Sequence, residues 1–302
     1  MMFKRLALAA AVLAALTTAA TAQVVVASKM DTEGGLLGNI ISQVLQSHDI
    51  AVSEKIQLGT TVVMRGALEN GQIDIYPEYT GNAAFFFDKA SDSLWNDAKL
   101  AYEEAKKLDY EANKIVWLPP APANNTWAVA IRNDVAQANH IATFTDFGKW
   151  VAGGGAVKLI ASPDFVNSPG ALPKFQQVYG FSLTPEQMVI INAGDTAVTI
   201  QAAAQQTSGV NAAMVYGTDG GITASGLVVL EDDKGVQPVY EPAPLIREAI
   251  LQQYPEIADW LAPVFAKLDL PTLQALNGRI QVGGEAAQSV AIDWLRSNGF
   301  MS

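Results

Sequence analysis

Cysteine is absent from the 302-residue sequence, and histidine occurs only at positions 48 and 140. The chain therefore has no disulfide and no thiolate ligand, and neither histidine stands at a spacing typical of a metal site or a catalytic triad. No G-x-S-x-G segment occurs, and the triple glycine at 153–155 fits neither G-x-G-x-x-G nor a P-loop. We predict no metal, no cofactor and no catalytic residue.

Basic residues are also few, with 19 lysines and arginines against 30 aspartates and glutamates, for a formal net charge of −11. A nucleic-acid-binding protein would carry a basic patch, so nucleic acid is not an expected partner. The acidity favours solubility and mildly favours a cationic small molecule.

Only the N-terminus carries a long apolar run. Lys4 and Arg5 precede an apolar stretch that ends near Leu16, and Ala20–Ala22 has the A-x-A form of a cleavage site. A membrane anchor is the alternative, but the run is shorter than the roughly 20 residues that span a bilayer. We predict a signal peptide at 1–22 and export to the periplasm. Without cysteine the mature protein has no lipid anchor, and we expect a freely diffusing monomer.

Strand and helix patterns alternate through the mature chain. A β-branched run at 24–27, a helical pattern at 36–45, a strand at 52–58, a helix at 60–70 and a short strand at 73–76 form a βαβαβ pattern, which predicts a parallel sheet. We expect Pro77 to end the last of these strands. A second set of elements runs from the strand Trp127–Arg132 to the strand Leu227–Leu230 and includes a helix at about 172–179 and the strand Ala212–Tyr216. An irregular segment to 244 and helices follow.

Two α/β blocks joined by two irregular segments predict a bilobed protein with a ligand cleft between the lobes. The expected boundaries are 23–127 plus 235–302 for lobe I, which is discontinuous, and 128–234 for lobe II. Four aromatic residues stand where strands end or segments cross between lobes: Tyr79, Trp127, Tyr216 and Tyr240.

Aromatic faces hold quaternary ammonium groups, which cannot donate hydrogen bonds, through cation–π attraction. Each ring taken singly is also typical of a half-buried side chain with a wet polar tip. Tyr76 alternates with Ile73 and Ile75 and is predicted to belong to the sheet. The sequence alone does not show whether the four rings meet.

Several segments together resemble one family. They are "YPEYTGN", "PANNTWAVAIR", "GDTAVTIQAAAQQTSGVNAAMVYGTDG" and "PVYEPAPLIRE", which lie in order along the mature chain. The chain resembles the osmoprotectant-binding components of ABC transporters, of the OsmF/YehZ type within the glycine betaine, carnitine and choline binding family. The resemblance implies a type II periplasmic-binding-protein fold, whose lobes close around a ligand and deliver it to permease subunits in the inner membrane, with an ATPase acting indirectly.

The resemblance also implies an aromatic cage at Tyr79, Trp127, Tyr216 and Tyr240. Lys29 and Asn82 correspond to positions that contact the carboxylate of a betaine in relatives. Where relatives often carry an arginine that clamps this carboxylate, the sequence has Ser168. We therefore expect weak glycine betaine binding or a ligand without a carboxylate.

Two other readings stay open. One keeps the fold but binds an amino acid or another small zwitterion, which the ring set disfavours because primary ammonium groups prefer carboxylates and carbonyls. The other is an exported enzyme that uses the same cleft, with Glu78 or Asp219 as its candidate residue. Our prediction is a binding protein and not an enzyme.

Overall fold

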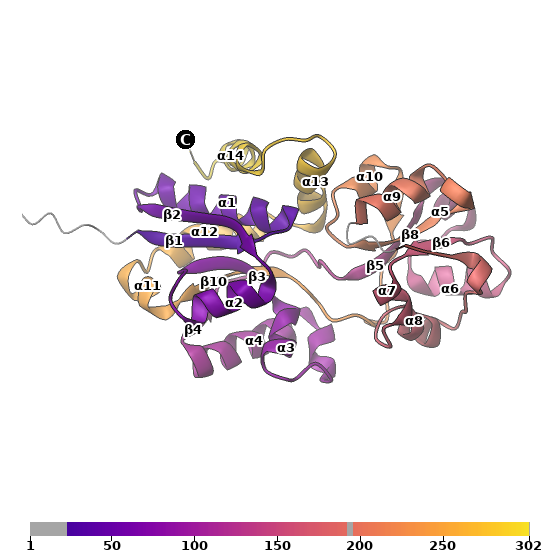
Figure 1. The fold of residues 1–302 in the computed structure, drawn as a ribbon, viewed down its shortest axis with the longest axis horizontal. Coiled ribbons are helices and arrows are strands. Elements are labelled where there is room, and N and C mark those ends of the chain that lie inside the picture. The colour runs from indigo at the N-terminus through magenta and orange to yellow at the C-terminus, as the bar shows by residue number, and fades with distance from the viewer. Residues whose placement is uncertain (1–22, 192–195, 302) are drawn as a thin grey trace, which may run out of the picture.

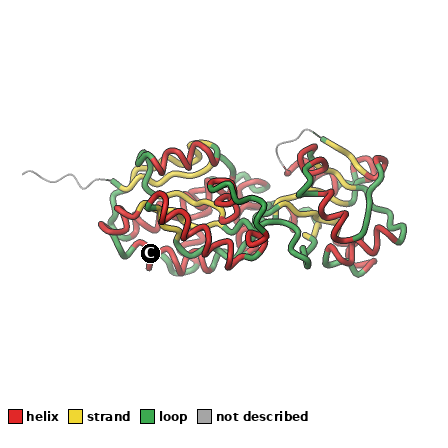
Figure 2. The backbone as a smooth tube through the Cα atoms, turned by 90° about the horizontal axis from the view of Figure 1, so that it is seen from below, coloured by secondary structure: helices red, strands yellow, loops and turns green. Residues whose placement is uncertain are grey.

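A computed structural model describes residues 23–191 and 196–301, so the predicted signal peptide at 1–22 lies outside the described residues. The chain forms two α/β lobes that lie next to each other along the long axis and meet at a narrow waist (Figures 1 and 2). Each lobe is built on a five-stranded sheet, with strand orders β2-β1-β3-β10-β4 and β7-β6-β8-β5-β9. The predicted bilobed architecture is confirmed, while the exact lobe boundaries stay a prediction.

The sheet of lobe I is mixed. β1 pairs in parallel with β2 and β3, as the βαβαβ pattern predicts, whereas β10 runs antiparallel to both β3 and β4. β10 was not predicted, because two prolines within six residues are unusual in a strand. The strands are β1 (Val24–Lys29), β2 (Val52–Gly59), β3 (Ile75–Tyr79), β4 (Ile115–Trp117) and β10 (Pro242–Arg247).

β3 continues through Pro77, which pairs in register with Pro244 of β10. The prediction that Pro77 ends this strand is therefore wrong. Thr80 donates to the carbonyl of Glu241 next to β10 at 3.0 Å, so the alternation of an antiparallel pair turns the nitrogen of Pro77 towards β1. Since the register of β1 on β3 extends only to Ile75, Pro77 has no ladder partner to lose.

The sheet of lobe II mixes both directions as well. β6 pairs in parallel with β7 and β8, while β5 is antiparallel to β8 and β9. The bounds of β5 and β8 agree with those expected from the sequence. The strands are β5 (Trp127–Arg132), β6 (Leu159–Ala161), β7 (Met188–Ile190), β8 (Ala212–Tyr216) and β9 (Leu227–Val229).

Helices cover both faces of each sheet, so side chains alternate between two hydrophobic cores. Ile75 packs towards α1, whereas the neighbouring Tyr76 is buried on the opposite face, as predicted for a sheet residue. No helix in the described ranges is long and apolar enough to cross a membrane. One face of the first sheet packs against α1 (Thr32–Ser47), α11 (Glu248–Gln253), α12 (Ile257–Ala266), α13 (Leu270–Gln281) and α14 (Ala287–Ser297), and the other against α2 (Thr61–Glu69), α3 (Ala83–Phe86) and α4 (Ala98–Asn113).

The second sheet has the same layered arrangement. Val129 faces one core and Ala130 the other, because neighbouring strand residues point to opposite faces. One face packs against α5 (Asn133–Asn139), α6 (Phe144–Ala152), α7 (Pro163–Asn167) and α8 (Leu172–Tyr179), and the other against α9 (Thr196–Ala204) and α10 (Gly221–Ala224).

Two crossing segments connect the lobes, at 118–126 and 230–241 (Figure 1). They are joined by hydrogen bonds near the site: the amide of Asn125 donates to the carbonyl of Tyr240 at 2.9 Å, and the amide of Tyr240 donates to Oδ1 of Asn124 at 2.8 Å. Motion of one crossing segment is therefore coupled to the other, as a shared hinge requires.

Candidate functional site

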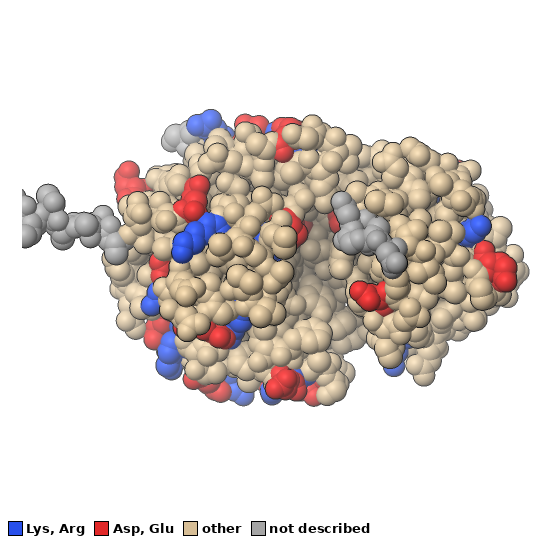
Figure 3. Space-filling view, in the orientation of Figure 1, with Lys and Arg blue, Asp and Glu red and all other residues tan. Residues whose placement is uncertain are grey.

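A pocket of about 610 Å³ lies between the lobes, where the surface is hollowed (Figure 3). Its walls come from the ends of strands in both sheets, from the crossing segments and from α13. All of the residues predicted for the site line this pocket: Lys29, Tyr79, Asn82, Trp127, Ser168, Tyr216 and Tyr240.

Three of the four predicted rings come from strand ends. Tyr79 is the last residue of β3, and Trp127 begins β5 directly opposite Tyr216, which ends β8. That register turns both side chains to the same side of the sheet, and their ring centroids lie 6.5 Å apart with an interplanar angle of 29°. Phe165 of α7 supports the indole edge-on at 6.0 Å. The pocket thus has a stacked pair of rings on the lobe II side.

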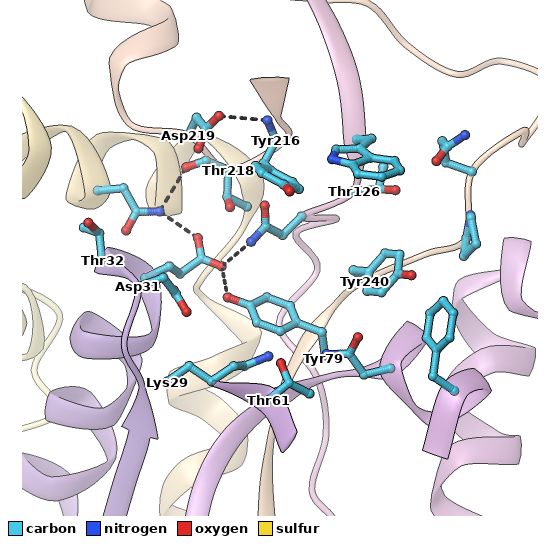
Figure 4. A pocket seen from close by; sticks show the side chains of 18 of the residues that line it. Lys29, Asp31, Thr32, Thr61, Tyr79, Thr126, Tyr216, Thr218, Asp219 and Tyr240 are labelled. Atoms are coloured by element: carbon cyan, nitrogen blue, oxygen red, sulfur yellow. Dashed lines mark hydrogen bonds between the residues drawn. The ribbon is translucent and has the colours of Figure 1, made fainter. Parts of the chain in front are cut away.

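Tyr240 comes from the second crossing segment and faces the other rings across the pocket (Figure 4). Its ring packs against Gly81, where a Cβ would lie 2.7 Å from Cε1 of Tyr240. Gly81 has no positive φ, so it serves close approach of the ring and not an unusual turn. The loop after Tyr79 therefore helps to position a ring from a segment about 160 residues away.

The ammonium of Lys29 and the side-chain amide of Asn82 both bind the carboxylate of Glu78. Nζ of Lys29 lies 2.5 Å from Oε1 of Glu78, and Nδ2 of Asn82 donates to the same oxygen at 2.7 Å. Glu78 is fully buried and also accepts the Tyr76 hydroxyl at 3.0 Å. The Lys29 ammonium additionally lies over the Tyr79 ring, 4.2 Å from its centroid. The positive charge of Lys29 is thus compensated by the carboxylate of Glu78.

Ser168 follows α7, and its amide closes the helix by donating to the carbonyl of Asp164 at 2.9 Å. It lines the pocket from lobe II, on the side opposite Lys29. Of the charged residues that line the pocket, one is a lysine and the others are acids, namely Asp31, Glu33 and Asp219.

Glu33 is the principal site residue that the sequence analysis missed. It lies in the first turn of α1, which begins because the Asp31 side chain accepts the amide of Gly34 at 2.7 Å. Oε1 of Glu33 accepts the Tyr79 hydroxyl at 2.7 Å and Nδ2 of Asn125 at 3.2 Å. Oε2 accepts Nδ2 of Asn277 at 2.6 Å (Figure 4).

Burial raises the pKa of Glu33 from 4.5 to about 7, because the low-dielectric surroundings disfavour the charged form. Hydrogen bonds from Thr218, Tyr79 and Asn277 oppose this shift, and the charge of Asp31 adds to it. Burial also raises the pKa of Tyr79 well above its usual value, so its hydroxyl stays a donor. The pocket therefore holds a carboxyl group that titrates near neutral pH.

Phe85 and Asn277 are among the further pocket residues that were not expected from the sequence. Phe85 is 60% exposed and lines the pocket. Asn277 reaches the pocket from α13, far along the chain. A signal for Glu33 was available, because "DTEGG" directly follows β1, and ligands gather at the carboxyl ends of parallel strands. No local signal marks Asn277.

Among the described residues no group of three or more metal-ligating side chains occurs. His48 is exposed and stacks on Trp260 at 4.0 Å, remote from the pocket lining. His140 is exposed as well.

Residues 22–297 match the family model described as the substrate binding domain of ABC-type glycine betaine transport system. The chain belongs to this family. It is 55% identical to the glycine betaine-binding protein YehZ of Escherichia coli (strain K12) over 281 residues, which cover 93% of this chain and 92% of that protein. It is 33% identical to a glycine-betaine-binding protein of Pseudomonas aeruginosa over 279 residues, covering 90% and 87% of the two chains.

The solved structure of apo YehZ from Escherichia coli superposes with a TM-score of 0.88, covering 92% of this chain and 99% of that one. A glycine betaine/carnitine/choline ABC transporter structure, 21% identical, superposes with a TM-score of 0.82 over 93% of this chain and all of that one, and so shares the fold. The predicted type II periplasmic-binding-protein fold and the predicted family are both confirmed.

Proposed function

We propose that this protein captures a quaternary ammonium osmolyte between its lobes in the periplasm and delivers it to the permease of an ABC importer. The observation that carries the proposal is the meeting of Tyr79, Trp127, Tyr216 and Tyr240 in one pocket. The names of the relatives, which bind glycine betaine, support it.

The chemistry of the pocket suits a methylated ammonium ion. Such an ion has no N–H to donate, so it loses little in leaving water for ring faces, each desolvated contact contributing about 2 kcal/mol. Three or four contacts supply an affinity in the micromolar range, about −8 kcal/mol. Acidic residues in the lining, such as Asp31, add long-range attraction for the cation.

Lobe closure completes the site. The first sheet contributes Tyr79, the second sheet contributes Trp127 and Tyr216, and a crossing segment contributes Tyr240. Rotation about the coupled crossing segments brings the rings of the two lobes around a bound cation. A closed surface formed from both lobes is then available to the permease.

Calorimetric titration of the mature protein at pH 8 tests the proposal. We expect binding of trimethylammonium compounds such as choline, glycine betaine and carnitine, and of tetramethylammonium, but no binding of glycine or glutamine. Preferential binding of amino acids would support the alternative ligand class and overturn the quaternary ammonium assignment. Recovery of the bound ligand unchanged, measured by NMR, is expected of a transport protein, whereas a converted product would identify an enzyme.

A further inference from the structure

The polar end of the pocket contains buried acceptors that find no partner within the protein. Oδ1 of Asn125, Oγ1 of Thr126 and Oδ1 of Asn277 are buried and make no hydrogen bond, as is true of the donor Nε1 of Trp127 among the aromatic rings, and all four residues line the pocket. Thr126 is 8% exposed and Asn277 is 2% exposed. Because burying a polar atom without a hydrogen-bond partner is unfavourable, these atoms indicate a ligand group that pairs with them.

Glu33 is the charge at the centre of this group. The donors to its two oxygens are the neutral side chains of Tyr79, Asn125, Asn277 and Thr218, so no cation compensates the buried carboxylate. The lysine in the lining does not do so, because its ammonium is paired with Glu78 at 2.5 Å. A carboxylate held only by neutral donors keeps its negative charge uncompensated and attracts a cation.

The same surroundings are unfavourable for an anionic ligand group. A ligand carboxylate at this end of the pocket would meet the carboxylate of Glu33 and the amide oxygens of Asn125 and Asn277, all of which are acceptors. A ligand hydroxyl would instead donate to the unpaired amide oxygen of Asn125 or Asn277, and the cationic ligand as a whole would be attracted by Glu33.

We propose that Glu33, with Asn125 and Asn277, forms an acceptor subsite that makes the pocket prefer quaternary ammonium alcohols over quaternary ammonium carboxylates. Glu33 is in this view a specificity-determining residue. The inference rests on the proposed function, since it assigns the ligand end that lies beyond the aromatic rings. The preferred ligand class is then choline-type cations. The aromatic rings bind the quaternary ammonium group of alcohols and carboxylates alike.

Five titratable or charged groups line the pocket near Glu33 or pair with those that do: Asp31 at the N-cap of α1, Tyr79 on β3, Asp219 after β8, and Lys29 with its partner Glu78. Of these, Asp31 gives a matched control. Its side chain is exposed and caps α1, and asparagine at the same place caps equally well while removing one negative charge. Asp31→Asn thus changes the pocket charge as Glu33→Gln does, but not at the acceptor subsite.

The test measures dissociation constants of choline, glycine betaine and tetramethylammonium by calorimetry at pH 8, for wild type, Glu33→Gln, Glu33→Asp and Asp31→Asn. We expect wild type to prefer choline, and Glu33→Gln to lower the choline-to-betaine affinity ratio tenfold or more, since the attraction of Glu33 for a net cation is lost and its repulsion of the betaine carboxylate is removed. Asp31→Asn should leave the ratio within about threefold. Glu33→Asp, which keeps the charge, should keep the preference for choline.

The possible failures are distinct. If wild type binds none of the three cations, the proposed function fails and this inference with it. If wild type binds them but Glu33→Gln leaves the ratio unchanged, or Asp31→Asn lowers it equally, the cage stands and the acceptor subsite is overturned. Thermal unfolding of each variant confirms that the ratios are measured on folded protein.

Discussion

Gly220 of lobe II lies directly against Gly278 of α13 in lobe I, so closely that a Cβ on Gly220 would stand 2.1 Å from the nitrogen of Gly278. Three hydrogen bonds from α13 surround this contact. Gln281 accepts the amide of Gly220 at 3.0 Å, Gln274 donates to the carbonyl of Gly217 at 2.7 Å, and Asn277 donates to that of Thr218 at 2.9 Å. The lobes therefore touch at a place separate from the two crossing segments.

Gly220→Ala is expected to separate the lobes at this contact, because the backbone of α13 cannot yield to a side chain. We expect ligand affinity to fall at least tenfold and the interlobe distance to increase, as measured by calorimetry and small-angle X-ray scattering. Gly66→Ala in α2 is the control, since a Cβ there meets nothing within 4 Å. It should leave binding unchanged and stabilise the helix by roughly 0.5–1 kcal/mol. Unaltered affinity of Gly220→Ala would show that the contact is not part of the closing movement.

Loss of either stacked ring should abolish binding. Trp127→Ala and Tyr216→Ala each remove a ring face worth about 2 kcal/mol to a desolvated cation, and each also opens the pocket to water. We expect affinity for tetramethylammonium to fall 30-fold or more in calorimetry. Trp150→Ala is the matched control, because Trp150 of α6 packs against Phe147 and does not line the pocket. Retained affinity in both ring variants would contradict the cage.

An arginine at Ser168 should improve binding of a carboxylate ligand. Ser168→Arg places a guanidinium at the pocket wall, where a charge-assisted hydrogen bond contributes about 1.5–3 kcal/mol. Glycine betaine affinity should rise about tenfold or more, whereas choline affinity should not rise. Ser168→Gln, which lengthens the side chain without a charge, should give no such gain. Equal effects of arginine and glutamine would contradict an electrostatic cause.

The raised pKa of Glu33 predicts a specific dependence of stability on pH. The folded protein retains the Glu33 proton up to about pH 7, whereas the unfolded chain loses it near 4.5, so between these values the folded state binds more protons. The Glu33 contribution to the free energy of unfolding therefore falls as pH rises from about 4.5 to 7. Over this range the loss is about 3 kcal/mol, at 1.36 kcal/mol per pKa unit.

Urea unfolding of wild type and Glu33→Gln at pH 5 and pH 8 measures this contribution. The variant lacks the titrating group, so it should gain stability relative to wild type as pH rises. Parallel pH profiles for the two proteins would mean that the carboxylate is ionised in the folded state throughout this range.

Much of the fold was predictable from local patterns. The bounds of β5, β8 and α8 agree with the prediction to the residue, because alternation and helical periodicity are properties of neighbouring positions. β10 could not be predicted in this way. Its prolines are tolerated only because their nitrogens face away from the ladder hydrogen bonds with β3. The direction in which each nitrogen faces depends on the pairing of β10 with β3 and β4.

The candidate site also has features that the sequence predicts and features that it does not. Tyr79, Trp127, Tyr216 and Tyr240 could be named from their places at strand ends and crossings, and from resemblance to a family. The pairing of Lys29 with Glu78 could not be, although both residues were singled out. Their contact joins positions 49 residues apart. It compensates the charge of Lys29, which was expected to contact a ligand carboxylate.

The sequence by itself determined the kinds of element, the two-block organisation and the chemistry of the rings, because each depends on residue type and short-range spacing. Tertiary structure alone decided which polar groups share the pocket. Glu33 and Asn277 are 244 residues apart and come within 2.6 Å only when α13 packs beside α1. The charge and the pKa of the site arise from that packing, since burial and hydrogen-bond partners, and not residue identity, set the free energy of a buried carboxylate.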